Sequence, residues 1–136
     1  MTRRPAQRRY IRRCLVFSVL YVATLSAALR LVEPGHVTGF AAYALATLPG
    51  LAIIGVFWAI GRLLVEETDE YLRLLLVRQS LVATAFALSI ATVWGFLELL
   101  KLAPHVDTFL NAPLWFGGLG VGQLYNRLTL GPAPRA

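Results

Sequence analysis

The two histidines, His36 and His105, are the side chains in this sequence best suited to chemistry. Each lies in a short proline-containing segment between apolar stretches, and Glu33, Glu98 and Asp107 lie near them in the sequence. Imidazole nitrogens and carboxylate oxygens together can bind Zn²⁺ or another divalent cation, so the two histidines form a candidate metal site. A role in sensing pH is an alternative, because histidine titrates near neutral pH. The simplest interpretation is two solvated turn residues.

No catalytic motif accompanies the histidines. The sequence contains no paired histidine motif on a helix, no dinucleotide fingerprint, and no nucleophile placed beside a base. The single cysteine, Cys14, excludes an intramolecular disulfide and a cysteine metal site within this sequence. The glycine-rich segment 117–122 lacks the Gly-Lys-Ser/Thr ending of a phosphate-binding loop. The sequence therefore predicts a protein that is not an enzyme and has no cofactor.

A charged segment, residues 62–78, lies between two apolar stretches. Acidic residues near a helix start interact favourably with the helix dipole, so we expect a helix from Asp69 with Thr68 as its N-cap. The functional alternative is a docking patch for a cytoplasmic partner or a cation. The candidate interaction residues are Glu66, Glu67, Asp69, Glu70 and Arg73.

Four long uncharged runs determine where these residues lie: 14–29, 37–61, 79–97 and 108–126. Only 15% of the residues are charged, whereas a soluble domain carries about a quarter. About 20 apolar helical residues cross the bilayer core, and an apolar segment in lipid must satisfy its backbone as a helix. We therefore expect an all-α membrane protein, a bundle of four transmembrane helices in a single domain (14–128). The predicted spans are 13–32, 38–62, 78–100 and 109–127, between a basic cytoplasmic tail (1–13) and a second cytoplasmic tail (129–136).

The basic residues predict the orientation of these spans. Eleven of the 13 Lys and Arg residues lie in the two tails and in the segment 62–78, and only Arg30 and Lys101 lie on the other side. The positive-inside rule then places both termini in the cytoplasm. A basic tail can also bind nucleic acid, but no recognition motif or aromatic platform accompanies it. We expect the lipid bilayer, and not nucleic acid, as its partner.

The first span also has features of a cleavable secretory signal. Basic residues precede an apolar core at 15–25, and Ser26-Ala27-Ala28 imitates a cleavage site. Cleavage there would leave three spans. Apolar character continues to Val32, which favours an uncleaved anchor.

Small residues recur at intervals of four in the third and fourth spans. Helices in lipid associate by close packing, so such stripes mark where backbones approach one another. The candidate packing residues are Ala83, Ala87, Ala91, Gly95, Gly118 and Gly122. Because four helices do not need every stripe internally, we also expect a homo-oligomer or packing into a larger membrane complex.

An internal repeat is a further hypothesis. The segments 33–40 and 103–109 both contain Pro, His, Val, Thr and Phe in that order. Two tandem helical hairpins in the same sense would explain the match and would place the two histidines at equivalent positions.

The stretch from Asp69, D-E-Y-L-R, together with W-G-F-L-E at 94–98, resembles a group of small four-span bacterial inner-membrane proteins of unknown function. In that group a D-E-[FY]-x-R element precedes the third span. The resemblance implies a bacterial plasma-membrane location and four helices, and it implies no activity. The matching positions are Asp69, Glu70, Tyr71, Arg73, Trp94 and Glu98.

The function that we expect is that of a non-catalytic structural, interaction or accessory subunit in the membrane. The first alternative is a minimal homodimeric transporter or channel. Pro49 and Gly50 lie near the middle of the second span, where proline kinks a helix and such breaks can line a substrate path. A packing kink is the more common outcome. The third possibility is an outer-face metal or redox protein that uses His36 and His105.

Overall fold

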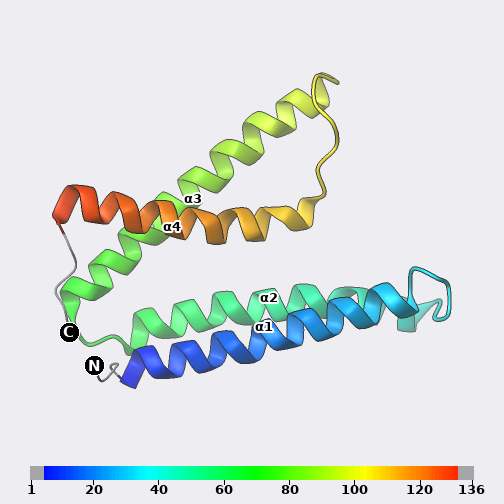
Figure 1. Ribbon diagram of the computed structural model, residues 1–136, viewed down its shortest axis with the longest axis horizontal. Coiled ribbons are helices and arrows are strands. Elements are labelled where there is room, and N and C mark those ends of the chain that lie inside the picture. Colours follow the sequence, from blue (N-terminus) through cyan, green and yellow to red (C-terminus); the bar gives the residue numbers. More distant parts are fainter. Residues whose placement is uncertain (1–4, 132–136) are drawn as a thin grey trace. The chain divides into compact units, whose positions relative to one another are not determined.

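The computed structural model describes residues 5–131, and these residues form four α-helices without a strand. The ends of the predicted tails, residues 1–4 and 132–136, lie outside the described residues. The all-α prediction is confirmed for these residues, and each predicted span overlaps one helix. The helices are α1 (Pro5–Leu31), α2 (Phe40–Glu66), α3 (Glu70–Leu99) and α4 (Asn111–Leu130), with a short 3₁₀ turn, η1 (Thr108–Leu110), before α4 (Figure 1).

Three of the helices are long and apolar enough to cross a membrane. They are α1, α2 and α3, with 27, 27 and 30 residues. At 1.5 Å per residue, 27 residues extend about 40 Å, more than the hydrocarbon core of about 30 Å. The fourth helix has 20 residues and is less apolar, because it contains Asn111, Gln123 and Asn126 among several glycines.

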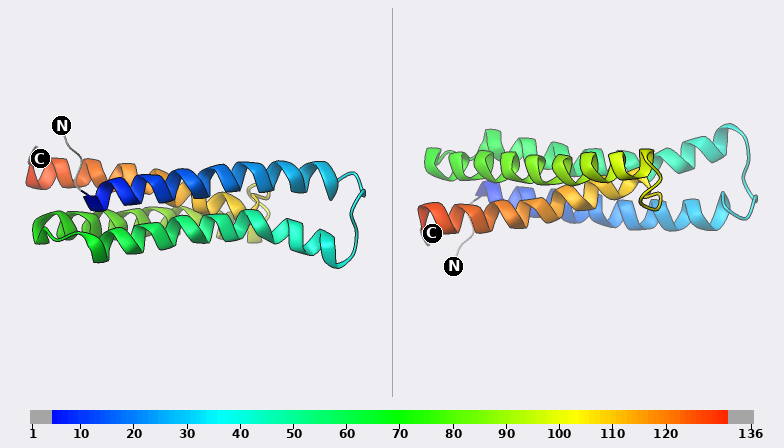
Figure 2. Two further views of the ribbon diagram at one scale, coloured as in Figure 1. Left: turned by 90° about the horizontal axis from the view of Figure 1, so that it is seen from below. Right: turned by 90° about the horizontal axis from the view of Figure 1, so that it is seen from above.

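The chain consists of two compact units, and the boundary between them lies between Thr68 and Asp69. The first unit contains α1 and α2, and the second contains α3 and α4. Each unit is a helical hairpin, with its two helices lying side by side in antiparallel directions (Figure 2). This division matches the expected tandem hairpins, whereas the single four-helix domain and the duplication stay predictions.

In the first hairpin, the chain reverses between α1 and α2 through two glycines in the left-handed region. Gly35 has φ +80° and Gly39 has φ +71°, a conformation that side chains with a Cβ rarely adopt. One face of α2 is buried, and glycine there allows close packing: a Cβ at Gly55 would collide with the ring of Phe17. The buried residues of α2 are Pro49, Ala52, Gly55, Ala59 and Leu63.

Pro49 lies inside α2, which runs as one helix from Phe40 to Glu66. Its ring is buried, whereas Gly50 is exposed and has open space where a Cβ would be. The proline therefore does not interrupt the helix, and the predicted kink stays a prediction.

The second hairpin begins at a capped helix terminus. The Asp69 side chain accepts hydrogen bonds from the backbone N–H groups of Tyr71 (2.9 Å) and Leu72 (3.2 Å). Asp69 is therefore the N-cap, and the prediction of Thr68 as N-cap was wrong by one residue. A carboxylate accepts these bonds more strongly than a hydroxyl, because it is charged and lies at the positive end of the helix dipole.

The helices α3 and α4 cross and then separate toward the connecting loop (Figure 1). Small residues of the two helices face one another. A Cβ at Gly118 would lie 2.8 Å from the carbonyl oxygen of Ala83. A Cβ at Gly122 would lie 2.5 Å from the carbonyl oxygen of Gln79. Contacts at intervals of four residues on both helices are the pattern of inclined ridge-into-groove packing.

Amide side chains hold the same helix pair together. Gln79 Nε2 donates to the carbonyl oxygen of Leu119 (2.8 Å), and Asn126 Nδ2 donates to that of Leu75 (2.9 Å). These bonds cross from one helix to the other and satisfy donors in an otherwise apolar interface.

The candidate packing residues differ in burial. Ala83, Ala87, Gly118 and Gly122 are buried, in the region where α3 and α4 cross. The other two lie nearer the loop, where the helices separate: Ala91 is half-buried and Gly95 is exposed.

The hairpins carry small side chains inside and large apolar side chains outside. Among residues 5–131, the buried hydrophobic residues are Ala6, Ala52, Ala59, Leu63, Ala83 and Ala87, and no large side chain is fully buried. The exposed large apolar residues include Leu15, Val19, Val22, Leu51, Ile54, Trp58, Leu81, Leu88, Val93, Phe96, Leu124 and Leu128. Extended exposed apolar surface is typical of faces that contact lipid or another protein.

Candidate functional sites

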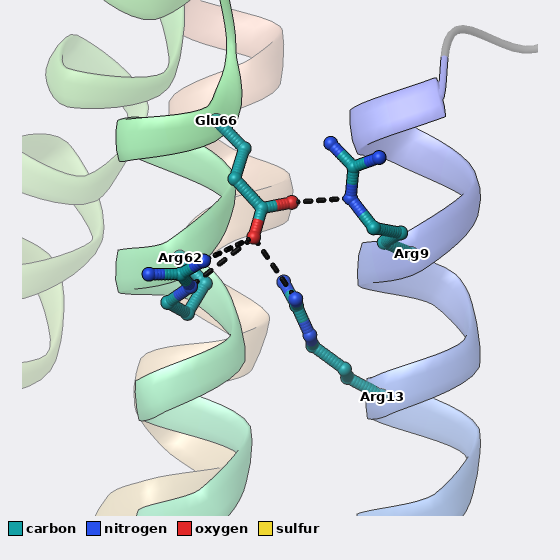
Figure 3. A network of polar contacts seen from close by, with 4 residues as sticks. All are labelled: Arg9, Arg13, Arg62 and Glu66. Carbon is teal, nitrogen blue, oxygen red and sulfur yellow. Dashed lines mark hydrogen bonds and ion pairs between the residues drawn. The ribbon is translucent and has the colours of Figure 1, made fainter.

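Three arginines surround one carboxylate near the α1–α2 end that is opposite the loop (Figure 3). Arg9 Nε donates to Glu66 Oε2 (2.7 Å), and Arg13 Nη2 donates to Glu66 Oε1 (2.9 Å). Arg62 donates to the same Oε1 from Nε (3.1 Å) and Nη2 (2.8 Å). We call these four residues the arginine–glutamate cluster.

The guanidinium of Arg13 is the most enclosed of the three. Its side chain is 20% exposed, against 46% for both Arg9 and Arg62. It lies over the ring of Trp58, 5.1 Å from the ring centroid, and Phe17 packs edge-on against the same indole. Arg13 Nη1 is buried and has no hydrogen-bond partner among residues 5–131. The cation–π contact with Trp58 compensates part of this loss.

The electrostatics of the cluster are unbalanced. Hydrogen bonds from Arg13, then from Arg9 and Arg62, lower the pKa of Glu66 from 4.5 to about 2, so the carboxylate is ionised at neutral pH. Three positive charges and one negative charge leave an excess of two positive charges. This excess lies at the ends of two predicted spans, since Arg13 begins the first span and Arg62 ends the second.

The cluster could have been predicted from sequence, although its residues lie far apart along the chain. Arg9 and Arg13 are one helical turn apart, and so are Arg62 and Glu66. In an antiparallel hairpin, residues equally far from the loop face each other, and Arg13 and Trp58 are equally far from its middle. Aligning the runs 14–29 and 37–61 in antiparallel directions about the loop would therefore have predicted that the residues at their ends meet.

The other four candidate interaction residues lie in different local environments. Glu67 is buried at the C-cap of α2, and Asp69 caps α3. Glu70 and Arg73 are exposed near the start of α3. A docking patch made by the five residues stays a prediction.

A second polar cluster lies at the loop end of α3. Glu98 Oε1 accepts the backbone N–H of Val106 (2.8 Å), and Glu98 Oε2 lies 3.1 Å from His105 Nδ1. The indole N–H of Trp94 donates to the carbonyl oxygen of Pro104 (3.1 Å). These three contacts fasten the loop to the last turns of α3, so the cluster has a positioning role.

The same end of the second hairpin contains an open cleft of about 390 Å³. It forms because α3 and α4 separate beyond their crossing point. The cleft is mainly apolar, with a few polar groups. Its lining residues are Ile90, Ala91, Trp94, Gly95, Glu98, Val106, Thr108, Leu110, Asn111 and Leu114.

The two histidines belong to different units. His36 is exposed in the loop before α2, and His105 is 76% exposed between two carboxylates, with Nε2 3.7 Å from Asp107 Oδ1. Nδ1 faces Glu98, so Nε2 is the nitrogen that a cation could reach. Within residues 5–131, no three His, Cys, Asp or Glu side chains are grouped to hold a metal ion. The metal site at His36 and His105 stays a prediction.

No protein-family model, curated protein or solved structure matches this chain.

Proposed function

We propose that this chain is a non-catalytic multi-pass protein of the bacterial inner membrane, which packs with itself or with a larger membrane complex. The observation that carries the proposal is the distribution of side chains in the two hairpins. Alanine and glycine form the helix contacts, and leucine, valine and phenylalanine face outward. Hydrocarbon or another membrane helix can cover such a surface without cost.

Four spans with both termini in the cytoplasm is the topology that we propose. The helix α4 is less apolar than the others, but its contacts with α3 support a fourth span. They extend from Asn126 and Leu75 to Trp115 and Thr84, so α4 runs antiparallel to the first half of α3. If α3 crosses the bilayer, a helix packed along it in the opposite direction crosses it too. The arginine distribution supports the orientation, and the bacterial location rests on the resemblance of residues 69–98 alone.

A role as a subunit is supported by small residues that the other helix of the same hairpin does not cover. Gly50 and Gly95 have no atom within 4 Å of an added Cβ, and both are exposed on membrane-length helices. Uncovered small residues on such helices allow another helix to approach closely.

The test begins with membrane association and then measures assembly. We expect the full-length protein to stay with the membranes after alkaline carbonate extraction. In mild detergent, we expect it to elute as a homo-oligomer or with one stoichiometric partner. Gly50→Leu should weaken this assembly because it blocks close approach, whereas Gly61→Leu, near the end of α2, is the matched control.

Two outcomes would contradict the proposal. Release of the protein by carbonate would contradict the membrane location, and a strictly monomeric protein without a partner would contradict the subunit role. Flux of an ion or metabolite through protein in liposomes, abolished by Gly50→Leu, would identify a transporter or channel instead.

A further inference from the structure

The arginine–glutamate cluster lies at the level where an apolar segment ends on both helices of the first hairpin. Arg13 directly precedes the uncharged run 14–29, and Arg62 directly follows the run 37–61. Both arginines reach the same oxygen of Glu66, so the two boundaries lie side by side (Figure 3). In a bilayer this level is the headgroup region, where lipid phosphates lie.

The cluster has more charge and more donors than Glu66 can satisfy. Each guanidinium has five N–H donors, and the carboxylate oxygens accept four bonds in all. Two excess positive charges beside a low-dielectric core attract anions strongly. The side chains of Arg9 and Arg62 are 46% exposed, so their outer N–H groups can reach a ligand.

The cluster presents two exposed guanidinium groups, so it can bind two anionic groups. Arg9 and Arg62 approach Glu66 from different helices, and their terminal nitrogens lie on different sides of its carboxylate (Figure 3). Guanidinium groups bind phosphate oxygens in a bidentate manner, one phosphate to each planar edge. Arg13 adds charge from its enclosed position over Trp58 but has less access to a ligand.

We propose that the arginine–glutamate cluster binds an anionic phospholipid whose headgroup carries two linked phosphodiesters, one at Arg9 and one at Arg62. The proposal rests on the proposed function, because the ligand is a lipid of the cytoplasmic leaflet. Glu66 holds the three guanidinium groups in place and leaves two positive charges for the two phosphates. A headgroup with two linked phosphates binds more tightly than two separate lipids, because its second phosphate binds without the entropy cost of a second lipid.

The experiment titrates the purified full-length protein in neutral detergent and follows tryptophan fluorescence, since Trp58 contacts Arg13. The probes are diphosphatidylglycerol, phosphatidylglycerol at twice the molar amount, phosphatidylcholine and inorganic phosphate. We expect diphosphatidylglycerol to bind about tenfold more tightly than the charge-matched phosphatidylglycerol. Phosphatidylcholine and inorganic phosphate should bind far more weakly.

The decisive variant is Arg9→Gln/Arg62→Gln, with Arg8→Gln/Arg12→Gln as the matched control. Arg8 and Arg12 are exposed on the same helix and contribute the same charge outside the cluster. Each pair of substitutions weakens attraction to anionic surfaces in general, by about fivefold per arginine. The preference for the linked headgroup should fall to about twofold only in the cluster variant. Arg9→Lys/Arg62→Lys, which keeps the charge, should also lose most of the preference, because lysine lacks the planar fork.

If wild type and Arg9→Gln/Arg62→Gln preferred diphosphatidylglycerol over phosphatidylglycerol equally, the proposed site would be wrong. Displacement of the lipid by inorganic phosphate at comparable concentration would overturn its assignment to a lipid headgroup. The two proposals can be tested separately. If the protein resists carbonate extraction but does not prefer diphosphatidylglycerol, only the proposed lipid site is wrong. If carbonate extracts the protein, the proposed membrane function is wrong as well.

Discussion

At the scale of single residues, Glu66 shows how one carboxylate can organise the end of a hairpin. It joins Arg9 and Arg13 of α1 to Arg62 of its own helix, so its charge links the two helices at the end opposite the loop. The carboxylate lies outside the predicted spans, where a change of pH can reach it.

The Glu66 cluster predicts a particular dependence of stability on pH. The pKa of Glu66 is lowered from 4.5 to about 2 in the folded protein, chiefly by hydrogen bonds from Arg13 and Arg9. A lowered folded-state pKa means that the stabilisation is complete above pH 4.5 and is lost as the pH falls toward 2. The difference in Tm between wild type and Glu66→Gln in detergent should therefore be constant from pH 7 to about 5 and then narrow.

Glu33→Gln is the control for this measurement, because Glu33 is exposed in the loop before α2. Its Tm should stay close to that of the wild type over the same range. If Glu33→Gln and Glu66→Gln gave the same curve, the network around Glu66 would not stabilise the hairpin.

Asp69 carries a second prediction at this scale. Its side chain accepts two backbone hydrogen bonds at the start of α3, so Asp69→Ala should cost about 1 kcal/mol in the free energy of unfolding. Asp69→Asn removes the same charge but keeps an acceptor, and it should lose less than half of that amount. Denaturant unfolding in mixed micelles gives both values. Equal losses in the two variants would assign the effect to charge and not to capping.

At the scale of elements, the crossing of α3 and α4 depends on the absence of side chains at two positions. A Cβ at Gly122 would lie 2.5 Å from the carbonyl oxygen of Gln79, and backbone cannot move aside as a flexible side chain can. Gly122→Ala should therefore destabilise the second hairpin by about 1–3 kcal/mol. The free energy of unfolding in detergent measures the effect.

Gly120 provides the matched control on the same helix. No atom lies within 4 Å of a Cβ added there, so Gly120→Ala should be neutral or stabilise the helix by up to about 1 kcal/mol. A large loss at Gly120 instead would indicate that another helix or a second copy of the chain packs on that face.

At the scale of the whole molecule, the helices alone do not determine the number of membrane spans. Three helices meet the length and hydropathy of a membrane span, and α4 is shorter and more polar. A reporter fused to each terminus should be active only in the cytoplasm, and a reporter inserted after Gly35 should be active only outside. A carboxy-terminal reporter found outside would mean that α4 does not cross the bilayer and that the chain has three spans.

The approximate positions of the helices could be predicted from sequence, because they depend on local properties, whereas α1 begins at Pro5, well before its predicted span. Apolar runs bounded by charge gave four segments, and each segment lies within a helix or overlaps most of one. The start of α3 was misplaced by one residue, because Thr68 and Asp69 are both good caps and only the backbone geometry distinguishes them. The small-residue stripe of α3 predicted close packing, but not where α3 and α4 separate.

Sequence alone, through hydrophobicity and the distribution of charge, predicted that the chain has long apolar helices and roughly where each one lies. Only the tertiary structure decided which charges meet. It joined Glu66 to arginines more than 50 positions away along the chain and Glu98 to the loop at Val106. The physical reason is that helix formation depends on neighbours in sequence, whereas an ion pair between helices depends on how each hairpin closes.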